Sequence, residues 1–194
     1  TKVSEGCRHC YAETMNEYRH WVKEWGPEGE RRRTSVTTWK EVEKWNYRAG
    51  WERRRELVFV GSLMDVLEDR DELVPWRDEL VSLVERCGHL DFLFLTKRPE
   101  LALELLPYQW GAIQWPANVW MGATMENQEQ VERRMDALAE IPAQVRFISV
   151  EPMLGRVILP FIYKPSWVIC GGESEAGCRP MDIEWALDLK RQCE

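Results

Sequence analysis

The stretch DFLFLTKRPE, residues 91–100, decides the fold class of this chain. Its apolar run FLFL shows no alternation of polar and apolar residues, which is typical of a strand buried on both faces of a parallel sheet. Three polar residues, TKR, follow the run directly, and Pro99 then begins a helix that we expect over about residues 99–106. A buried strand, a polar loop and a helix in this order predict one βα unit.

The same unit recurs on both sides of this stretch. Strands are expected at 57–60, 91–95, 118–121, 145–150 and 167–170, with helices at about 11–25, 72–87, 99–106, 127–140 and from about 182. The connection between residues 150 and 167 is too short and too rich in proline for a regular helix. No G-x-G-x-x-G follows the first strand, which disfavours a dinucleotide-binding sheet. We therefore expect an α/β fold built as a parallel (β/α) barrel, partial and truncated at both ends. A doubly wound open sheet is the alternative.

The composition is that of one globular domain over residues 1–194. With 44% apolar and 30% charged residues, the chain is long enough to bury a sizeable core. Its apolar runs are only strand-sized, which predicts no membrane span. Six dispersed cysteines suit a reducing cytoplasm better than a secreted disulfide scaffold. The chain starts directly before a motif and stops inside an apolar-periodic stretch, so we expect a fragment.

Residues 27–55 differ from the rest of the chain. They are charged, rich in tryptophan and weakly periodic, which favours an insertion or lid over a core element. Residues 1–60 carry 13 Lys and Arg against 10 Asp and Glu, whereas residues 61–194 carry 13 against 23. Arginine triplets at 31–33 and 53–55, with tryptophans between them, suit phosphate contacts and base stacking. The alternative is a solvated segment whose tryptophans pack on the core. The acidic remainder argues against wrapping of duplex DNA.

Polar residues follow every expected strand. They are Ser62 and Asp65, then Thr96, Lys97 and Arg98, then Thr124, Glu126 and Asn127, then Glu151, and finally Gly171, Gly172, Glu173 and Ser174. In a parallel barrel the carboxyl ends of the strands meet at one rim, where such folds build their active sites. The pattern therefore predicts a polar ligand site at that rim.

Some rim residues have more specific interpretations. Gly171 and Gly172 allow close backbone approach, and their amides suit a carboxylate or phosphate, although a simple tight turn has the same sequence. Lys97 suits an anionic ligand or a surface position at a helix start. Glu151 comes directly out of a buried strand, which favours a functional role. None of the three histidines follows a strand, so Ser-His-Asp catalysis is poorly supported.

The motif SEGCRHCYAE, residues 4–13, carries two cysteines, Cys7 and Cys10. A lone C-x2-C is a weak signal that suits a redox dithiol, half of a zinc site or part of an iron–sulfur ligand set. A thioredoxin-like dithiol follows a strand in a much smaller fold. No second C-x2-C is present to complete a structural zinc site. An iron–sulfur cluster normally takes four thiolates, but three suffice where the fourth iron binds a small molecule.

Six blocks, in order along nearly the whole chain, resemble a phage-associated three-cysteine-motif family that is described as a domain of unknown function. The blocks are TKVSEGCRHCYAE, VFVGSLMDVLED, FLFLTKRPE, VWMGATMENQE, RFISVEPMLG and WVICGGESEAGCRPM. The resemblance implies a further cysteine directly before Thr1, which gives C-x6-C-x2-C. It also implies that the family continues past Glu194 into another strand. Residues 20–55 show the least similarity, and Cys178 departs from the small residue of its relatives.

Three cysteines at the start of a βα barrel are in turn similar to the radical S-adenosylmethionine enzymes, although the usual motif of those enzymes is C-x3-C-x2-C. The resemblance implies a 4Fe-4S cluster, with Cys7 and Cys10 as its second and third ligands and Tyr11 beside the cluster or the adenine. S-adenosylmethionine would chelate the open iron and be cleaved to a 5′-deoxyadenosyl radical. Cofactor or substrate contacts would come from the rim residues Ser62, Asp65, Lys97, Glu126, Asn127, Glu151, Gly171, Gly172 and Glu173. In those enzymes Gly-Gly-Glu lies early in the barrel, whereas here it follows the last expected strand.

The primary hypothesis is thus a cytoplasmic radical S-adenosylmethionine-type enzyme that modifies or repairs a nucleic acid or nucleotide. It would require an external electron donor and could involve a partner protein. The alternative is a non-catalytic binding module in which the cysteines hold zinc or an iron–sulfur cluster. A third hypothesis is a hydrolase-like barrel in which Asp65, Glu126 and Glu151 hold a divalent metal.

Overall fold

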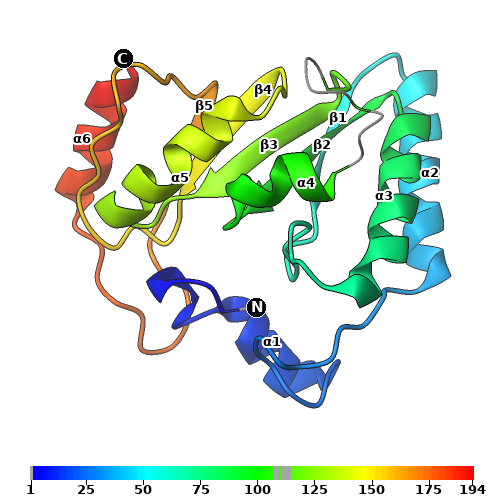
Figure 1. Ribbon diagram of the computed structural model, residues 1–194, viewed down its shortest axis with the longest axis horizontal. Helices are drawn as coiled ribbons and strands as arrows, with labels where there is room; N and C mark the ends of the chain where they lie inside the picture. The colour runs from blue at the N-terminus through cyan, green and yellow to red at the C-terminus, as the bar shows by residue number, and fades with distance from the viewer. Residues whose placement is uncertain (1, 107–109, 111–114) are drawn as a thin grey trace.

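The structure is a computed structural model that describes residues 2–106, 110 and 115–194. Its centre is a parallel sheet of five strands, β1 (Glu56–Val60), β2 (Leu90–Thr96), β3 (Val119–Thr124), β4 (Val145–Val150) and β5 (Trp167–Cys170). The strands lie in their sequence order, β1-β2-β3-β4-β5, and the sheet curls into half of a barrel (Figure 1). A doubly wound sheet reverses its strand order near the middle. The α/β class and the parallel sheet are confirmed, and the doubly wound alternative is excluded.

Helices cover the convex face of the sheet (Figure 1). They are α2 (Val36–Trp51), α3 (Val74–Arg86), α4 (Ala102–Leu105), α5 (Gln128–Glu140) and α6 (Ile183–Cys193), and short 3-10 turns, η2 (Asp71–Leu73) and η3 (Pro99–Leu101), precede α3 and α4. Between β4 and β5 the structure contains no helix among residues 151–166, as the prolines predicted. The main core lies between this helical layer and the sheet, and Phe92, Met121 and Ile148 are fully or almost fully buried in it. Because the side chains of a strand alternate between its faces, the remaining strand residues point into the concave side.

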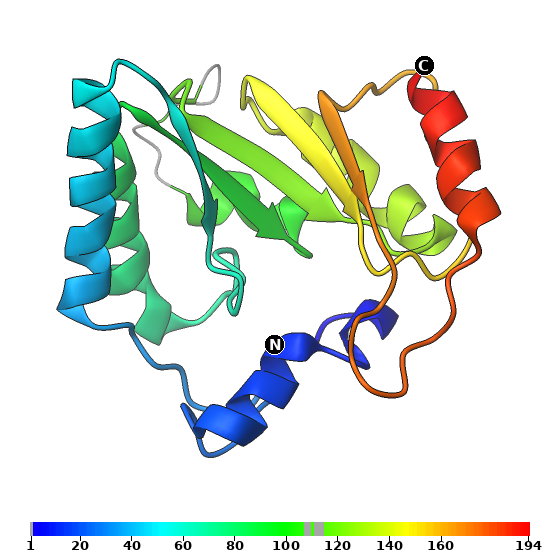
Figure 2. The same cartoon turned by 180° about the vertical axis from the view of Figure 1, so that it is seen from behind.

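The concave side of the half-barrel is only partly filled. Seen from behind, the described helices leave it uncovered (Figure 2). Phe147 is fully buried there and packs against Trp167 with ring centroids 5.9 Å apart. Gly122 lies beside Phe147 in the strand register, and a Cβ at Gly122 would come within 2.3 Å of the Phe147 ring. At the two edge strands Phe59 and Trp167 remain 48% and 42% exposed.

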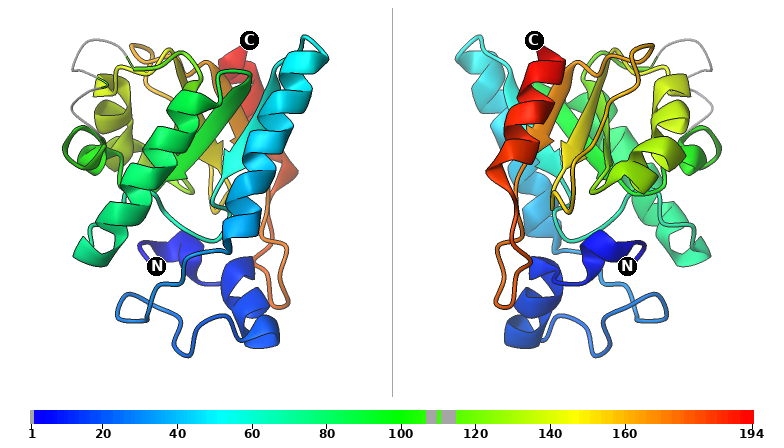
Figure 3. Two further views of the ribbon diagram at one scale, coloured as in Figure 1. Left: turned by 90° about the vertical axis from the view of Figure 1, so that its right-hand side faces the viewer. Right: turned by 90° about the vertical axis from the view of Figure 1, so that its left-hand side faces the viewer.

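The N-terminal segment lies beneath the carboxyl ends of the strands in all views (Figures 1, 2 and 3). It contains a 3-10 turn, η1 (Glu5–Cys7), and a helix, α1 (Tyr11–Arg19). The predicted helix over residues 11–25 was too long, since α1 ends at Arg19 and His20 adopts a left-handed conformation with φ of 50°. The amide side chain of Asn16 then bonds the backbone N–H and C=O of Val22, which ties the next turn of chain away from the helix.

Much of the expected insertion over residues 27–55 is the regular helix α2. Ser35 caps its N-terminus by accepting a hydrogen bond from the amide of Thr38, and Ala49 is completely buried. Trp39 and Val42 pack against the core from the same helix. Charged residues on the solvent side hid this apolar face in the sequence, because they weakened the helical period.

The structure also bears on membrane insertion. Among the described residues, every helix is too short or too polar to cross a bilayer.

Candidate functional site

A cavity of about 430 Å³ opens at the carboxyl ends of the strands, between the sheet and the N-terminal segment. Nine of the twelve residues that the sequence predicted for the site line it: Cys7, Cys10, Tyr11, Ser62, Asp65, Lys97, Glu151, Gly172 and Glu173. Glu126, Asn127 and Gly171 do not. Trp25, Phe59, Leu63 and Met64 add an apolar wall on one side. A cavity of this size, apolar with a few convergent polar groups, suits a small-molecule ligand.

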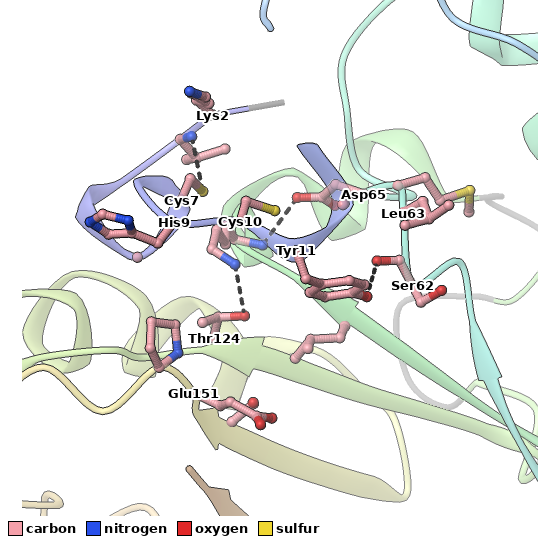
Figure 4. A pocket seen from close by; sticks show the side chains of 18 of the residues that line it. Lys2, Cys7, His9, Cys10, Tyr11, Ser62, Leu63, Asp65, Thr124 and Glu151 are labelled. Atoms are coloured by element: carbon pink, nitrogen blue, oxygen red, sulfur yellow. Dashed lines mark hydrogen bonds between the residues drawn. The ribbon is translucent and has the colours of Figure 1, made fainter. Parts of the chain in front are cut away.

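Cys7 and Cys10 enter the cavity from the N-terminal segment (Figure 4). Cys7 lies in η1 and is 7% exposed, and its sulfur accepts a hydrogen bond from the backbone N–H of Val3 at 3.4 Å. Cys10 stands directly before α1, at the N-cap position.

Tyr11 and Glu151 lie on opposite sides of the same space (Figure 4). The Tyr11 hydroxyl donates a hydrogen bond to the carbonyl of Ser62, which fixes the ring beside the cavity. Burial raises the pKa of the Tyr11 phenol above its ordinary value, and the charges of Cys10 and Glu151 add to the rise. The phenol therefore stays protonated. The exposed Glu151 carboxylate has no hydrogen-bond or ion-pair partner among the described residues, so it is available to a ligand.

Asp65 is held by its own loop, through the amide of Leu67, and by the end of β2 and the loop that follows it. Its carboxylate accepts hydrogen bonds from the Thr96 hydroxyl at 2.7 Å and from the Lys97 amide at 3.1 Å. An ion pair with Arg98 at 2.9 Å completes this set. Asp65 therefore ties the loop after β1 to the loop after β2. The Lys97 ammonium remains beside the cavity and donates to the Thr124 hydroxyl at 3.3 Å.

Glu126 is fully buried and does not reach the cavity. One carboxylate oxygen accepts hydrogen bonds from the Ser4 hydroxyl and from the Gly6 amide, the latter at 3.2 Å. The other oxygen pairs with Arg134 of α5 at 2.9 Å, and the Arg134 side chain is itself 1% exposed. Burial raises the pKa of the Glu126 carboxyl, but its hydrogen bonds and the charges of Arg134 and Lys97 outweigh this and lower it below its ordinary value. The carboxyl is therefore ionised, and it holds the cysteine-bearing segment.

The Gly-Gly-Glu after β5 has a comparable arrangement. Glu173 forms an ion pair with Arg179, and this guanidinium lowers the pKa of the Glu173 carboxyl. Arg179 also donates to the carboxylate of Glu5 at 2.8 Å and to its carbonyl at 3.1 Å. Gly171 faces Glu151, and a Cβ at this position would lie 3.0 Å from the Glu151 carboxylate. The sequence pattern thus found residues of the rim, but Glu126 binds the N-terminal segment directly and Glu173 is linked to it through Arg179.

Asn127 has a structural position in this fold. Its side-chain oxygen accepts a hydrogen bond from the amide of Gln130 at 3.1 Å, which caps the N-terminus of α5.

The arginine triplets are largely paired with carboxylates. Arg31 binds Glu68 at 2.6 Å, and Arg55 binds Asp91 at 2.5 Å. Arg33 and Arg54 also form ion pairs with glutamates. These contacts neutralise much of the positive charge that the sequence offered to phosphate.

Within residues 2–106, 110 and 115–194, no group of three or more His, Cys, Asp and Glu side chains is arranged to hold a metal ion. In particular Asp65 and Glu126, two members of the expected hydrolase-like set, are each engaged in contacts of their own. Cys7 and Cys10 nevertheless line one cavity.

Four residues that hold this site together were not predicted from the sequence: Ser4, Gly6, Arg134 and Arg179. Ser4, Gly6 and Arg179 contact partners far away in sequence, for example Glu126 at 122 residues from Ser4, whereas Arg134 pairs with Glu126 only eight residues away. Only Gly6 carried a local signal, because a glycine directly before a motif cysteine often marks a close backbone approach.

Comparison with known proteins gives one match. No curated protein and no solved structure matches the chain. A family model described as "Protein of unknown function (DUF5131)" matches residues 1–194. Because this match extends over the whole chain, the protein belongs to the DUF5131 family.

Proposed function

We propose that this protein binds a 4Fe-4S cluster on its cysteine motif and S-adenosylmethionine beside it, in the manner of the radical S-adenosylmethionine enzymes. One observation carries the proposal. Cys7 and Cys10 line the same 430 Å³ cavity as the polar residues that follow the parallel strands. A half-barrel that brings a cysteine motif to the carboxyl ends of its strands favours a partial (β/α) barrel related to those enzymes. We propose further that this protein is phage-associated, as the three-cysteine family is.

The residues present are compatible with such a cluster. Thiolates are soft ligands that select iron–sulfur clusters over hard cations such as Mg²⁺. The Val3 amide that donates to the Cys7 sulfur is a contact of the kind that tunes iron–sulfur centres. The third thiolate would come from the cysteine that the family resemblance implies directly before Thr1.

The chain's own side chains would bind and orient the cofactor. Lys97 offers a positive charge to a carboxylate, whereas Glu151 offers a carboxylate without a protein partner to an amine or a ribose hydroxyl. The protonated Tyr11 ring and the apolar wall next to it offer apolar contacts to the cofactor on that side. When bound, the cluster and S-adenosylmethionine supply one-electron chemistry for hydrogen abstraction.

The substrate of this proposal is a nucleic acid or a nucleotide, and the protein is cytoplasmic with an external electron donor. Because the arginine triplets are paired with carboxylates, support for a nucleotide comes from the cavity itself. Aromatic side chains at its wall, Tyr11, Trp25 and Phe59, offer surfaces on which a base can stack.

A second candidate is a binding module whose cysteines hold a metal without turnover. The observation in its favour is that Glu126 binds the N-terminal segment and Glu173 is paired with Arg179, which binds that segment, so that both carboxylates are engaged in structural contacts.

Anaerobic reconstitution tests the proposal. The chain is prepared with a cysteine directly before Thr1, and iron, acid-labile sulfide and deoxyadenosine released from S-adenosylmethionine under reductant are measured. We expect about four irons per chain, loss of this iron in Cys7→Ser, and no loss in the matched variant Cys87→Ser, whose thiol is buried near the end of α3. Stoichiometric zinc without a reducible cluster would refute the proposal. A bound cluster that does not cleave S-adenosylmethionine would support the second candidate, the binding module.

A further inference from the structure

The buried Glu126 carboxylate connects the cysteine-bearing segment to the body of the fold. Glu126 stands in the loop after β3, and its side chain is inaccessible to solvent. One oxygen meets the Ser4 hydroxyl and the Gly6 amide, and the other meets the Arg134 guanidinium. Arg134 is fixed in turn by donating to the carbonyl of Thr124 at 2.7 Å. A buried charge of this kind is tolerated only when it is paired and hydrogen-bonded, so the carboxylate has little freedom to move.

Gly6 permits the close approach of the segment to this carboxylate. A Cβ at Gly6 would lie 3.0 Å from the Glu126 carboxylate oxygen and 3.1 Å from its carboxyl carbon. A side chain at this position would therefore displace the turn, because Arg134 prevents the carboxylate from moving away. The next residue in the turn is Cys7, so a displacement of Gly6 is passed directly to a motif cysteine.

Arg179 holds the same turn from its other side. It bonds both the side chain and the carbonyl of Glu5 while it remains paired with Glu173. The turn Ser4–Cys7 thus lies between a contact from the loop after β3 and a contact from the loop after β5. These two loops are far apart in sequence, and they meet only because the half-barrel brings the strand ends to one rim.

We propose that Glu126 is a positioning residue that keeps Cys7 in place at the cavity, and that Gly6 is the residue whose lack of a side chain makes this contact possible. The inference concerns the protein before any metal binds. Its consequence for cluster assembly rests on the function proposed above.

The test compares Gly6→Ala with Gly155→Ala in the full chain without metal. Gly155 also lies in a rim loop, but a Cβ there would meet no heavy atom within 4 Å. The readout is the alkylation rate of Cys7 by iodoacetamide, resolved by mass spectrometry, with the buried Cys87 as an internal reference. Loss of a buried hydrogen bond to a charged group predicts a rise of about tenfold or more for Cys7 in Gly6→Ala. The rates of Cys87 in both variants, and of Cys7 in Gly155→Ala, should not change.

Equal rises at Cys7 and Cys87 would mean general loosening, and an unchanged Cys7 rate would mean that the contact does not hold the turn. Either result overturns the inference. If Gly6→Ala does not fold, Ser4→Ala replaces it, because it removes one hydrogen bond to Glu126 and adds no atom. Iron and sulfide are then measured on the same variants. Absence of iron in the chain that carries the added cysteine before Thr1 but no other change would defeat the proposed function, while the alkylation rates would still decide whether Glu126 positions Cys7.

Discussion

Removal of Arg134 tests the buried pair on which the site is built. In Arg134→Met the Glu126 carboxylate keeps its burial and loses its only buried cationic partner among the described residues. Breaking a buried pair from one side typically costs about 3–5 kcal/mol. The Thr124 carbonyl also loses its donor, which adds to this loss.

One feature of the structure lowers the loss of stability that we expect for Arg134→Met. Two nitrogens of the Arg134 guanidinium, Nε and Nη2, are buried with no hydrogen-bond partner among the described residues, and methionine removes them. We therefore expect the free energy of unfolding to fall by about 3 kcal/mol, at the lower end of the range for buried pairs. The matched control is Arg133→Met, which changes an exposed neighbour on the same helix and should stay within about 0.5 kcal/mol.

The assay is urea unfolding followed by tryptophan fluorescence, with both variants and the unchanged protein measured over a range of pH. The pKa of Glu126 is lowered in the folded protein, so its contribution to stability is present above the unfolded pKa and is lost as pH falls. The difference between the unchanged protein and Arg134→Met should therefore be fully present at neutral pH and narrow as pH falls below the ordinary glutamate pKa of 4.5. A loss below about 1 kcal/mol, the size of an exposed ion pair, would refute the reasoning. A difference that is independent of pH would refute it equally.

Three further predictions concern other contacts. Gly122→Ala would force a methyl group into the Phe147 ring, so the urea midpoint should fall by an amount equivalent to about 1–3 kcal/mol, and an unchanged midpoint would contradict this packing. Arg179→Gln removes the charge that lowers the pKa of Glu173, so the stability that this carboxylate loses as pH falls should shrink, as followed by thermal unfolding at several pH values. Asn127→Ala removes a helix cap and should cost about 1 kcal/mol without altering iron content, whereas loss of iron at full stability would assign Asn127 to the cofactor.

The strands were predictable because the signal for each is local. Short apolar runs predict the strands of a parallel sheet, and the five predicted strands agree with the five observed strands to within three residues at each end, although the concave face is only partly covered. The helices were harder to predict where other interactions obscure the helical pattern of apolar residues. Asn16 binds Val22 and ends α1 early, and the charged surface of α2 masks its buried side.

The candidate site was predictable as a location. Polar residues that follow consecutive parallel strands must share one rim, and nine of the twelve predicted residues line its cavity. The contacts that each of these residues makes were harder to predict from the sequence. Glu126 and Glu151 are both glutamates within two residues of a strand end, yet one is buried in an ion pair and the other is exposed without a protein partner among the described residues.

The sequence by itself determined that this chain is an α/β protein with parallel strands, a polar rim and a cysteine pair before its first helix. Those properties follow from patterns within a few residues, because burial and helix formation act on neighbouring side chains. Only the tertiary structure decided which carboxylates face the cavity and which hold the cysteine turn. That choice depends on Ser4 meeting the pair of Glu126 and Arg134 across more than a hundred residues of chain. The free-energy cost of burying each charge is determined only when these residues are in contact.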